Sequence, residues 1–271
     1  MSQLPLAVVT GAARGIGEAT VRRFATSGHA VAALDVNRER GEALAQELRS
    51  AGLQVQFYVC DVADAQAVDT LAASLQASWG PARVLVTSAA LIPNTESIMD
   101  MDLQAHDRMW RVNYHGTVPA CRSFGRPMVA AGQGGAIVTL GSINSLLPMP
   151  LPAYNPGKAA IARLTQLLAS ELGRHRIRVN SVGPTYVMTP ELQARLDSGV
   201  RDLGKMMGVH ALDFLPTPAD IAEAIAFLCS PAARAITGIL LPVDSGWSAS
   251  ATYMTYAGGV PWEQAPPKAQ A

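Results

Sequence analysis

The chain alternates between short apolar runs and longer stretches whose apolar residues recur at helical spacing. Residues 6–10 are a valine-rich apolar run, whereas residues 38–51 place Leu44 and Leu48 four positions apart among charged residues. The first pattern is typical of a buried strand and the second of an amphipathic helix. Along the chain, these patterns predict strands at residues 6–10, 30–34, 54–60, 83–87, 135–140, 177–182 and 239–243. They predict helices at residues 18–27, 38–51, 65–79, 154–174 and 218–228.

Continuous apolar strands that alternate with helices indicate a parallel sheet covered by helices on both faces. Because crossovers between parallel strands are right-handed, we expect an α/β fold with a doubly wound, Rossmann-like sheet of about seven strands. No linker or repeat divides the chain, so residues 1–271 are expected to form a single domain. Two segments interrupt the alternation, at residues 185–217 and 248–271.

Composition and charge exclude several classes of protein. Hydrophobic residues are 49% of the chain and charged residues 15%, which suits a large buried core and argues against disorder. Lys+Arg and Asp+Glu number 21 each, so no basic excess favours a nucleic acid as partner. No apolar run approaches the ~20 residues that span a membrane. The N-terminus lacks the pattern of a secretory signal, so we expect a cytoplasmic protein.

The cysteines and histidines show no metal-binding pattern. Cys60, Cys121 and Cys229 are far apart, and the five histidines have neither HxH nor HxxxH spacing. Metal sites need such clusters of ligands. We therefore expect free thiols and no bound metal.

A glycine-rich segment lies between the first predicted strand and the first predicted helix. It reads Thr10-Gly11-Ala12-Ala13-Arg14-Gly15-Ile16-Gly17. Glycines permit a tight turn and a close approach of backbone to phosphate, and the helix N-terminus offers free N–H groups. Asp35 follows the second strand, where a carboxylate can accept hydrogen bonds from the adenosine ribose hydroxyls and would repel a 2′-phosphate. This arrangement predicts a dinucleotide site that favours NAD over NADP.

Tyr154 and Lys158 are four positions apart at the start of a predicted helix, so their side chains share a face. A tyrosine has an ordinary pKa near ~10 and is a poor base at neutral pH, and a nearby ammonium would lower that pKa. Ser142 follows the fifth predicted strand, and its hydroxyl can polarise a carbonyl or orient an alcohol. These three groups suit general acid–base catalysis on a carbonyl or alcohol.

Taken in order, these motifs resemble the classical type of the short-chain dehydrogenase/reductase family. The resemblance covers about residues 6–247 and extends to Arg178-Val179-Asn180-Ser181-Val182-Gly183-Pro184 in the sixth strand. It implies an NAD-dependent oxidoreductase that interconverts a secondary alcohol or polyol and a ketone. It also implies a catalytic group with Tyr154 as general acid/base, assisted by Lys158, Ser142 and Asn113. Asn113 fits the position that holds a proton-relay water through a helix backbone.

The resemblance further implies contacts with cofactor and substrate. The expected cofactor-binding residues are Gly11, Arg14, Gly15, Ile16, Gly17, Asp35, Asp61, Val62, Ser88, Ala89, Tyr154, Lys158, Pro184, Val187 and Thr189. The expected substrate contacts are Ser142, Asn144 and Tyr154. Residues 185–217 would form a substrate lid, and residues 143–152 an apolar, uncharged pocket wall. We therefore expect a small or medium-sized alcohol, ketone or polyol and not a polyanion.

Two segments depart from the family pattern. The usual Asn-Asn-Ala-Gly after the fourth strand is here Thr87-Ser88-Ala89-Ala90. Thr and Ser can replace some hydrogen bonds, but Ala90 requires an ordinary φ or some strain. The glycine that usually follows the proline of strand six is here Thr185. Both changes bear on cofactor affinity more than on the fold.

Other functions share part of this pattern. A nicotinamide-binding regulatory or scaffold protein would have little catalysis, and the complete catalytic group argues against it. A halohydrin-type lyase replaces the lysine and the cofactor turn, and an extended epimerase or dehydratase needs a longer substrate domain. The family resemblance also implies a homotetramer, or alternatively a dimer. The C-terminal extension, residues 248–271, would then cover an interface or an active site with Tyr253, Met254, Tyr256 and Trp262.

Overall fold

A computed structural model describes residues 4–92 and 95–261, which contain one parallel seven-stranded sheet. Its strands are β1 (Leu6–Thr10), β2 (Ala30–Asp35), β3 (Val55–Val59), β4 (Val84–Thr87), β5 (Gly135–Leu140), β6 (Ile177–Pro184) and β7 (Leu240–Val243). They lie in the order β3-β2-β1-β4-β5-β6-β7, and every neighbouring pair is parallel. The predicted Rossmann-like fold is confirmed.

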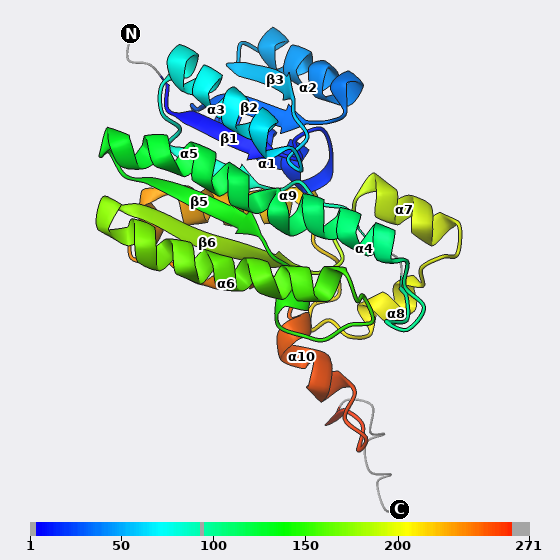
Figure 1. The fold of residues 1–271 in the computed structure, drawn as a ribbon. Helices are drawn as coiled ribbons and strands as arrows, with labels where there is room; N and C mark the ends of the chain where they lie inside the picture. Colours follow the sequence, from blue (N-terminus) through cyan, green and yellow to red (C-terminus); the bar gives the residue numbers. More distant parts are fainter. Residues whose placement is uncertain (1–3, 93–94, 262–271) are drawn as a thin grey trace, which may run out of the picture.

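Helices cover both faces of the sheet (Figure 1). One face packs against α1 (Gly15–Thr26), α2 (Arg38–Ser50) and α9 (Pro218–Cys229). The other packs against α3 (Ala65–Trp79), α5 (Thr117–Ala131) and α6 (Tyr154–Leu172). The central strands are apolar at nearly every position because both of their faces are buried.

Side-chain caps fix where several helices begin. Asn37 accepts a hydrogen bond at its Oδ1 from the N–H of Arg40 at 3.0 Å, at the start of α2. Thr217 and Asp220 form a reciprocal capping box at the start of α9. Caps of this kind satisfy N–H groups that have no partner within the helix. They also fix the loops that lead into these helices.

Several helices lie where the sequence pattern predicted none. They are α4 (Leu103–Trp110), a single π-helical turn (Arg111–His115), α5, α7 (Pro190–Asp197), α8 (Leu203–Met207) and α10 (Trp247–Met254). α5 was missed because it contains Gly125 and Pro127, residue types that usually interrupt helices. α7 and α8 are short and belong to the expected lid.

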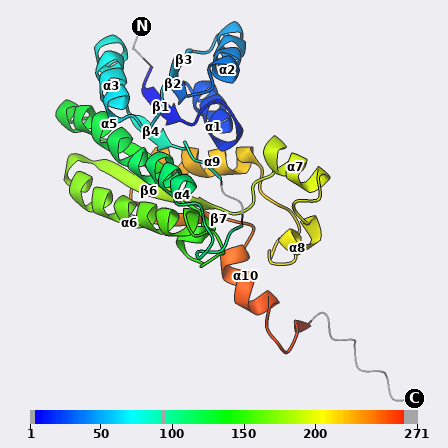
Figure 2. The same cartoon turned by 45° about the vertical axis from the view of Figure 1, so that its right-hand side comes forward.

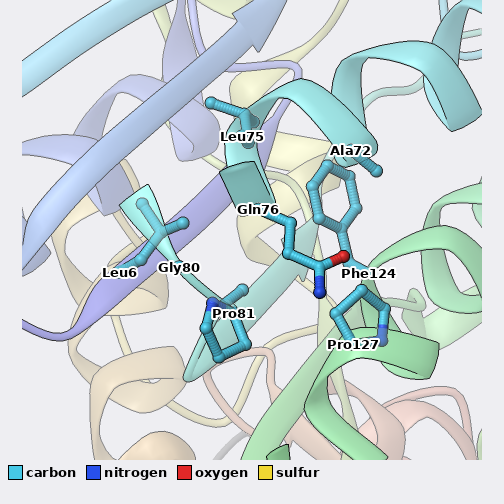
Figure 3. Close-up of a pocket in the computed structure, with 9 residues that line it drawn as sticks. Leu6, Ala72, Leu75, Gln76, Gly80, Pro81, Phe124 and Pro127 are labelled. Carbon is cyan, nitrogen blue, oxygen red and sulfur yellow. The ribbon is translucent and has the colours of Figure 1, made fainter. Parts of the chain in front are cut away.

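The strand order reverses between β1 and β4, and doubly wound sheets bind ligands at the carboxyl ends of strands near such a reversal. The opposite ends are closed. There a void of about 10 Å³ lies among nine residues, eight of which Figure 3 labels, and it has room for one water at most. Leu6 begins β1 and Gly80 and Pro81 precede β4, so this void is remote from the glycine-rich turn.

Candidate active site

The glycine-rich turn is packed so closely that side chains would clash with neighbouring backbone. Gly11 and Gly15 have φ angles of +66° and +55°, which favour glycine. A Cβ on Gly17 would lie 1.9 Å from the carbonyl oxygen of Gly11, and one on Gly11 would lie 2.6 Å from Ala89. Arg14 precedes α1 without a capping side chain, so the first N–H groups of the helix have no side-chain partner. Ile16 packs against the core and anchors this turn.

Asp35 ends β2 beside this turn. Its carboxylate accepts hydrogen bonds from the N–H groups of Ala13 at 3.0 Å and Asn37 at 2.9 Å. These bonds hold the charge at the wall of a surface cavity that Arg14 and Arg40 also line. The site therefore presents one fixed carboxylate beside two arginines.

A carboxylate from the segment expected to form the lid is ion-paired with both Arg14 and Arg40. Glu191, in the first turn of α7, lies 3.2 Å from Arg14 and 3.5 Å from Arg40. Desolvation raises the pKa of this carboxyl, but its hydrogen bonds and the charge of Arg14 together outweigh that effect and lower it. No sequence pattern marks Glu191, because only the fold brings it to arginines more than a hundred positions away in the chain.

The altered segment after β4 is accommodated without backbone strain. The N–H of Ala89 donates to Oγ1 of Thr10 at 3.3 Å, which ties the segment to β1. Ala90 is not among the described non-glycine residues with positive φ, so it adopts an ordinary conformation. Thr87 does not replace the family's asparagine fully, because its buried Oγ1 has no hydrogen-bond partner among the described residues. Ser88 lies beside Gly11, where the cofactor turn comes closest to the loop after β4.

Asn113 lies in the π-helical turn between α4 and α5. Its side chain accepts a hydrogen bond from the N–H of Leu91 at 2.7 Å and donates one to the carbonyl of Leu91 at 3.0 Å. The hydroxyl of Thr117 donates to the backbone carbonyl of Asn113 at 2.9 Å. π-turns occur frequently at functional sites. This turn joins the loop after β4 to the helices that flank the site.

Ser142, Tyr154 and Lys158 meet at the carboxyl end of β5. The hydroxyl of Ser142 lies close enough to the phenol of Tyr154 to lower its pKa. Nζ of Lys158 lies 5.3 Å from the centre of the Tyr154 ring and donates to the carbonyl of Leu140 at 2.6 Å. Lys158 is buried, whereas Tyr154 is partly exposed. The arrangement combines a partly exposed phenol with a buried ammonium behind it.

The structure corrects one expectation about this group. The spacing of Tyr154 and Lys158 predicts an ammonium that lowers the pKa of Tyr154. In the protein without ligand, burial raises the pKa of Tyr154 to about 12, and the hydrogen bond from Ser142 opposes that rise. Burial lowers the pKa of Lys158 to about 8. Desolvation disfavours the charged form of each group, so it outweighs their mutual attraction here.

The remaining expected cofactor residues lie around the same edge. Asp61 follows β3 and accepts from the N–H of Ala63 at 2.9 Å, while Val62 is buried beside Gly116. Pro184 ends β6, and its carbonyl lies 3.4 Å from Oγ of Ser142.

The segment expected to form the lid begins beside the glycine-rich turn. Val187 packs against the core, and Thr189 caps α7 by accepting from the N–H of Leu192 at 3.2 Å. The methyl group of Thr189 would lie 3.6 Å from a Cβ on Gly15. The fold thus brings this end of the lid to the cofactor turn.

A buried histidine joins the lid to the C-terminal helix. His210 receives or donates a hydrogen bond at Nε2 with Thr185, at 2.9 Å, and its Nδ1 lies 2.7 Å from the carbonyl of Met206. Tyr186 stacks on Trp247 with ring centres 5.1 Å apart, and His210 contacts the same Trp247. Desolvation lowers the pKa of His210. The hydroxyl of Thr185 thus has a hydrogen-bond partner in His210, which the glycine usual at this position would lack.

The residues at this edge fit a nicotinamide dinucleotide. The turn is packed too closely against its own backbone and Ala89 for side chains at Gly11 and Gly17, and the uncapped N-terminus of α1 suits a pyrophosphate. Among residues 4–92 and 95–261, no group of three His, Cys, Asp or Glu side chains could hold a metal ion. The same residues contain no helix long and apolar enough to cross a membrane.

Comparison with known proteins identifies the family. A family model described as enoyl-(acyl carrier protein) reductase matches residues 11–248. A galactitol 2-dehydrogenase of Rhizobium johnstonii is 38% identical over 250 residues, covering 89% of this chain and 94% of the relative. A D-threitol dehydrogenase of Mycolicibacterium smegmatis is 36% identical over 246 residues, covering 90% and 92%. The structure of a short-chain type dehydrogenase/reductase from Mycobacterium ulcerans matches with a TM-score of 0.87 at 27% identity, covering 93% and 94%. The chain therefore belongs to the short-chain dehydrogenase/reductase family and is an oxidoreductase that acts on CH–OH groups.

Proposed function

We propose that the protein is an NAD(H)-dependent dehydrogenase that interconverts a secondary alcohol, in particular a polyol, and its ketone. The observation that carries this proposal is the meeting of Ser142, Tyr154 and Lys158 at the edge of the sheet that holds the glycine-rich turn. The two relatives described above are named for the oxidation of polyols, which supports this substrate class.

The catalytic roles follow from the contacts. A nicotinamide cofactor held at the glycine-rich turn and Asp35 would supply the acceptor or donor of the hydride that leaves or joins the alcohol carbon. Tyr154 takes the hydroxyl proton during oxidation and gives it back during reduction. Ser142 holds the substrate oxygen beside this phenol. The ammonium of Lys158, behind the ring, favours the phenolate whenever the phenol gives up its proton. Asn113 holds the loop at Leu91, and its backbone carbonyl, which accepts from Thr117, has a second lone pair for a relay water.

The preference for NAD rests on Asp35. Its fixed carboxylate suits the two ribose hydroxyls and would repel the 2′-phosphate of NADP. Arg14 and Arg40 could attract that phosphate, but Glu191 is already paired with both. The carboxylate of Glu191 therefore adds to the preference for NAD that Asp35 sets.

The substrate contacts and the assembly remain parts of this proposal. Asn144 joins Ser142 and Tyr154 at the substrate side, and residues 143–152 form the pocket wall. A homotetramer in the cytoplasm is the expected working form, with the C-terminal extension at an interface. Trp262 and the residues after it lie outside the described part of the chain.

One assay tests the proposed function. Purified protein is incubated with NAD or NADP and a panel of polyols and simple secondary alcohols, and the absorbance of the reduced nicotinamide is recorded. We expect turnover with NAD and at least one polyol. A protein that binds NADH with no turnover of any panel member in either direction would instead be the regulatory or scaffold protein. The partnerless hydroxyl of Thr87 is the one observation on the described residues that favours that alternative.

A further inference from the structure

Three polar side chains form a line from α6 to the end of β5. Nδ2 of Asn155 donates to Oδ1 of Asn144 at 3.1 Å and to the carbonyl of Leu147 at 2.8 Å. Nδ2 of Asn144 in turn donates to Oγ of Ser142 at 3.0 Å, and the backbone N–H of Asn144 approaches the same oxygen at 3.2 Å. Ser142 and Asn144 are both buried. The line therefore ends at a hydroxyl of the catalytic group.

The chemistry of these groups fixes the direction of every bond in the line. A backbone carbonyl only accepts, so Asn155 must turn its NH₂ group toward Leu147. The same NH₂ group faces Asn144, which must therefore present its oxygen to Asn155 and its own NH₂ to Ser142. Both lone pairs of the Ser142 hydroxyl then accept hydrogen bonds. Its single proton has to point elsewhere.

The proton of Ser142 is left for the substrate side. The carbonyl of Pro184 lies 3.4 Å from Oγ, at the outer limit of a hydrogen bond, so it holds the proton only weakly. The phenol of Tyr154, where the substrate oxygen is expected, is the other polar group near this hydroxyl. A donor aimed there stabilises negative charge as it develops on that oxygen.

We infer that Asn155 is a positioning residue, which acts through Asn144 to make Ser142 a hydrogen-bond donor toward the substrate oxygen. This inference rests on the proposed function and deepens it. Asn155 lies between Tyr154 and Pro156, so the residue beside the acid/base also sets the direction of the neighbouring hydroxyl. Its second bond, to Leu147, ties the pocket wall to α6.

Asn155→Asp tests the inference because it changes the direction of the line, while it loses the bond to the Leu147 carbonyl just as Asn155→Ala does. A carboxylate only accepts, so Asn144 would turn its NH₂ toward position 155 and its oxygen toward Ser142. Ser142 would then donate to Asn144 and lose its role toward the substrate. Asn155→Ala, which removes the donors without imposing the reversal, is the matched control.

We expect kcat of Asn155→Asp to fall ~10-fold or more below that of Asn155→Ala, with KM changed less, since one donor to a developing oxyanion is worth about 10²-fold or more. A new charge near Tyr154 could lower kcat by itself, so Ser142→Ala is combined with each variant in a double-mutant cycle. If Asn155 acts through Ser142, adding Ser142→Ala to the Asn155→Asp variant costs little more activity. If Ser142→Ala lowers kcat of the Asn155→Asp variant by the same factor as it lowers kcat of the wild type, the inference is overturned.

A second measurement does not depend on turnover. In protein labelled with ¹⁵N-asparagine, Ser142→Ala should move the side-chain NH₂ signals of Asn144 in the wild type and leave them nearly unmoved in Asn155→Asp. Equal movement in both backgrounds would overturn the inference. If the wild type oxidises no alcohol while these signals behave as expected, the proposed function fails and the direction of the Ser142 hydroxyl stands.

Discussion

The ammonium of Lys158 lies 5.3 Å from the centre of the Tyr154 ring, but its hydrogen bond goes to the carbonyl of Leu140. The lysine is thus held behind the tyrosine by the end of β5 and not by the phenol itself. This leaves the phenol free to exchange a proton with a substrate. Burial disfavours the charged form of both groups. It therefore raises the pKa of Tyr154 to about 12 and lowers the pKa of Lys158 to about 8.

Tyr154→Phe should abolish most turnover while nearly preserving NAD binding. Phenylalanine keeps the ring but has no proton to exchange, and such general acid–base catalysis is typically worth ~10²–10⁴-fold in rate. Steady-state kinetics and NADH titration by fluorescence measure the two effects separately. If the variant keeps more than about a tenth of the rate, another group must be the acid/base. Lys158→Ala should by contrast weaken both turnover and NADH binding.

Lys158 should make the stability of the protein depend on alkaline pH. Below about pH 8 the lysine is charged both folded and unfolded, and burying the charge costs stability. Between about pH 8 and its ordinary pKa of 10.5, the unfolded chain holds the proton that the folded protein has released. The contribution of Lys158 to stability must therefore rise with pH across this window, by up to about 3 kcal/mol at 1.36 kcal/mol per pKa unit.

Urea unfolding of the wild type and Lys158→Met, without cofactor, measures this effect. The methionine variant lacks the titrating group, so the difference in unfolding free energy should shift in favour of the wild type as pH increases. Parallel pH profiles for the two proteins would show that Lys158 keeps an ordinary pKa when buried.

Asp35→Ala should narrow the preference for NAD over NADP. The carboxylate is held by two backbone N–H groups at the wall of the surface cavity, so it cannot turn away from a 2′-phosphate. We expect the ratio of kcat/KM with NAD to kcat/KM with NADP to fall about tenfold, which corresponds to about 1.4 kcal/mol. A wild type that already prefers NADP would contradict both this prediction and the proposed cofactor.

Glu191→Gln should raise the use of NADP by releasing Arg14 and Arg40 from the lid. Exposed ion pairs contribute up to about 1 kcal/mol, so we expect kcat/KM with NADP to rise about threefold, and less with NAD. Glu223→Gln is the control, because it removes a surface ion pair with Arg23 away from the expected cofactor contacts. Equal responses of the two variants would show that Glu191 has no part in cofactor choice.

The sequence predicted those features of the fold and the site that depend on residues close together in the chain. The turn at Gly11, the carboxylate at Asp35 and the pair Tyr154 and Lys158 lie at the strand and helix ends that periodicity predicts. α5 was missed because Gly125 and Pro127 conceal a buried helix whose stability comes from packing. Glu191 and the link from Asn155 to Asn144 depend on contacts across the fold. The lowered pKa expected for Tyr154 was wrong because spacing says nothing of burial.

The C-terminal extension should matter for assembly. Figures 1 and 2 show α10 projecting away from the sheet, and Tyr253 and Tyr256, near and just beyond its C-terminal end, are 50% and 70% exposed. α10 is nevertheless anchored, since the hydroxyl of Ser250 donates to the carbonyl of Val209 at 2.8 Å. Large aromatic groups on an anchored, projecting segment suit burial against another subunit.

Truncation after Ser250 tests this role, with truncation after Val260 as the matched control. Val260 is buried, so the control keeps nearly all of the described part of the extension. Because loss of residues 251–271 removes both exposed tyrosines, we expect a smaller assembly by light scattering and a higher KM. The control should keep the wild-type mass and kinetics. If the shorter protein also keeps its mass, kcat and KM, the extension serves neither an interface nor an active site.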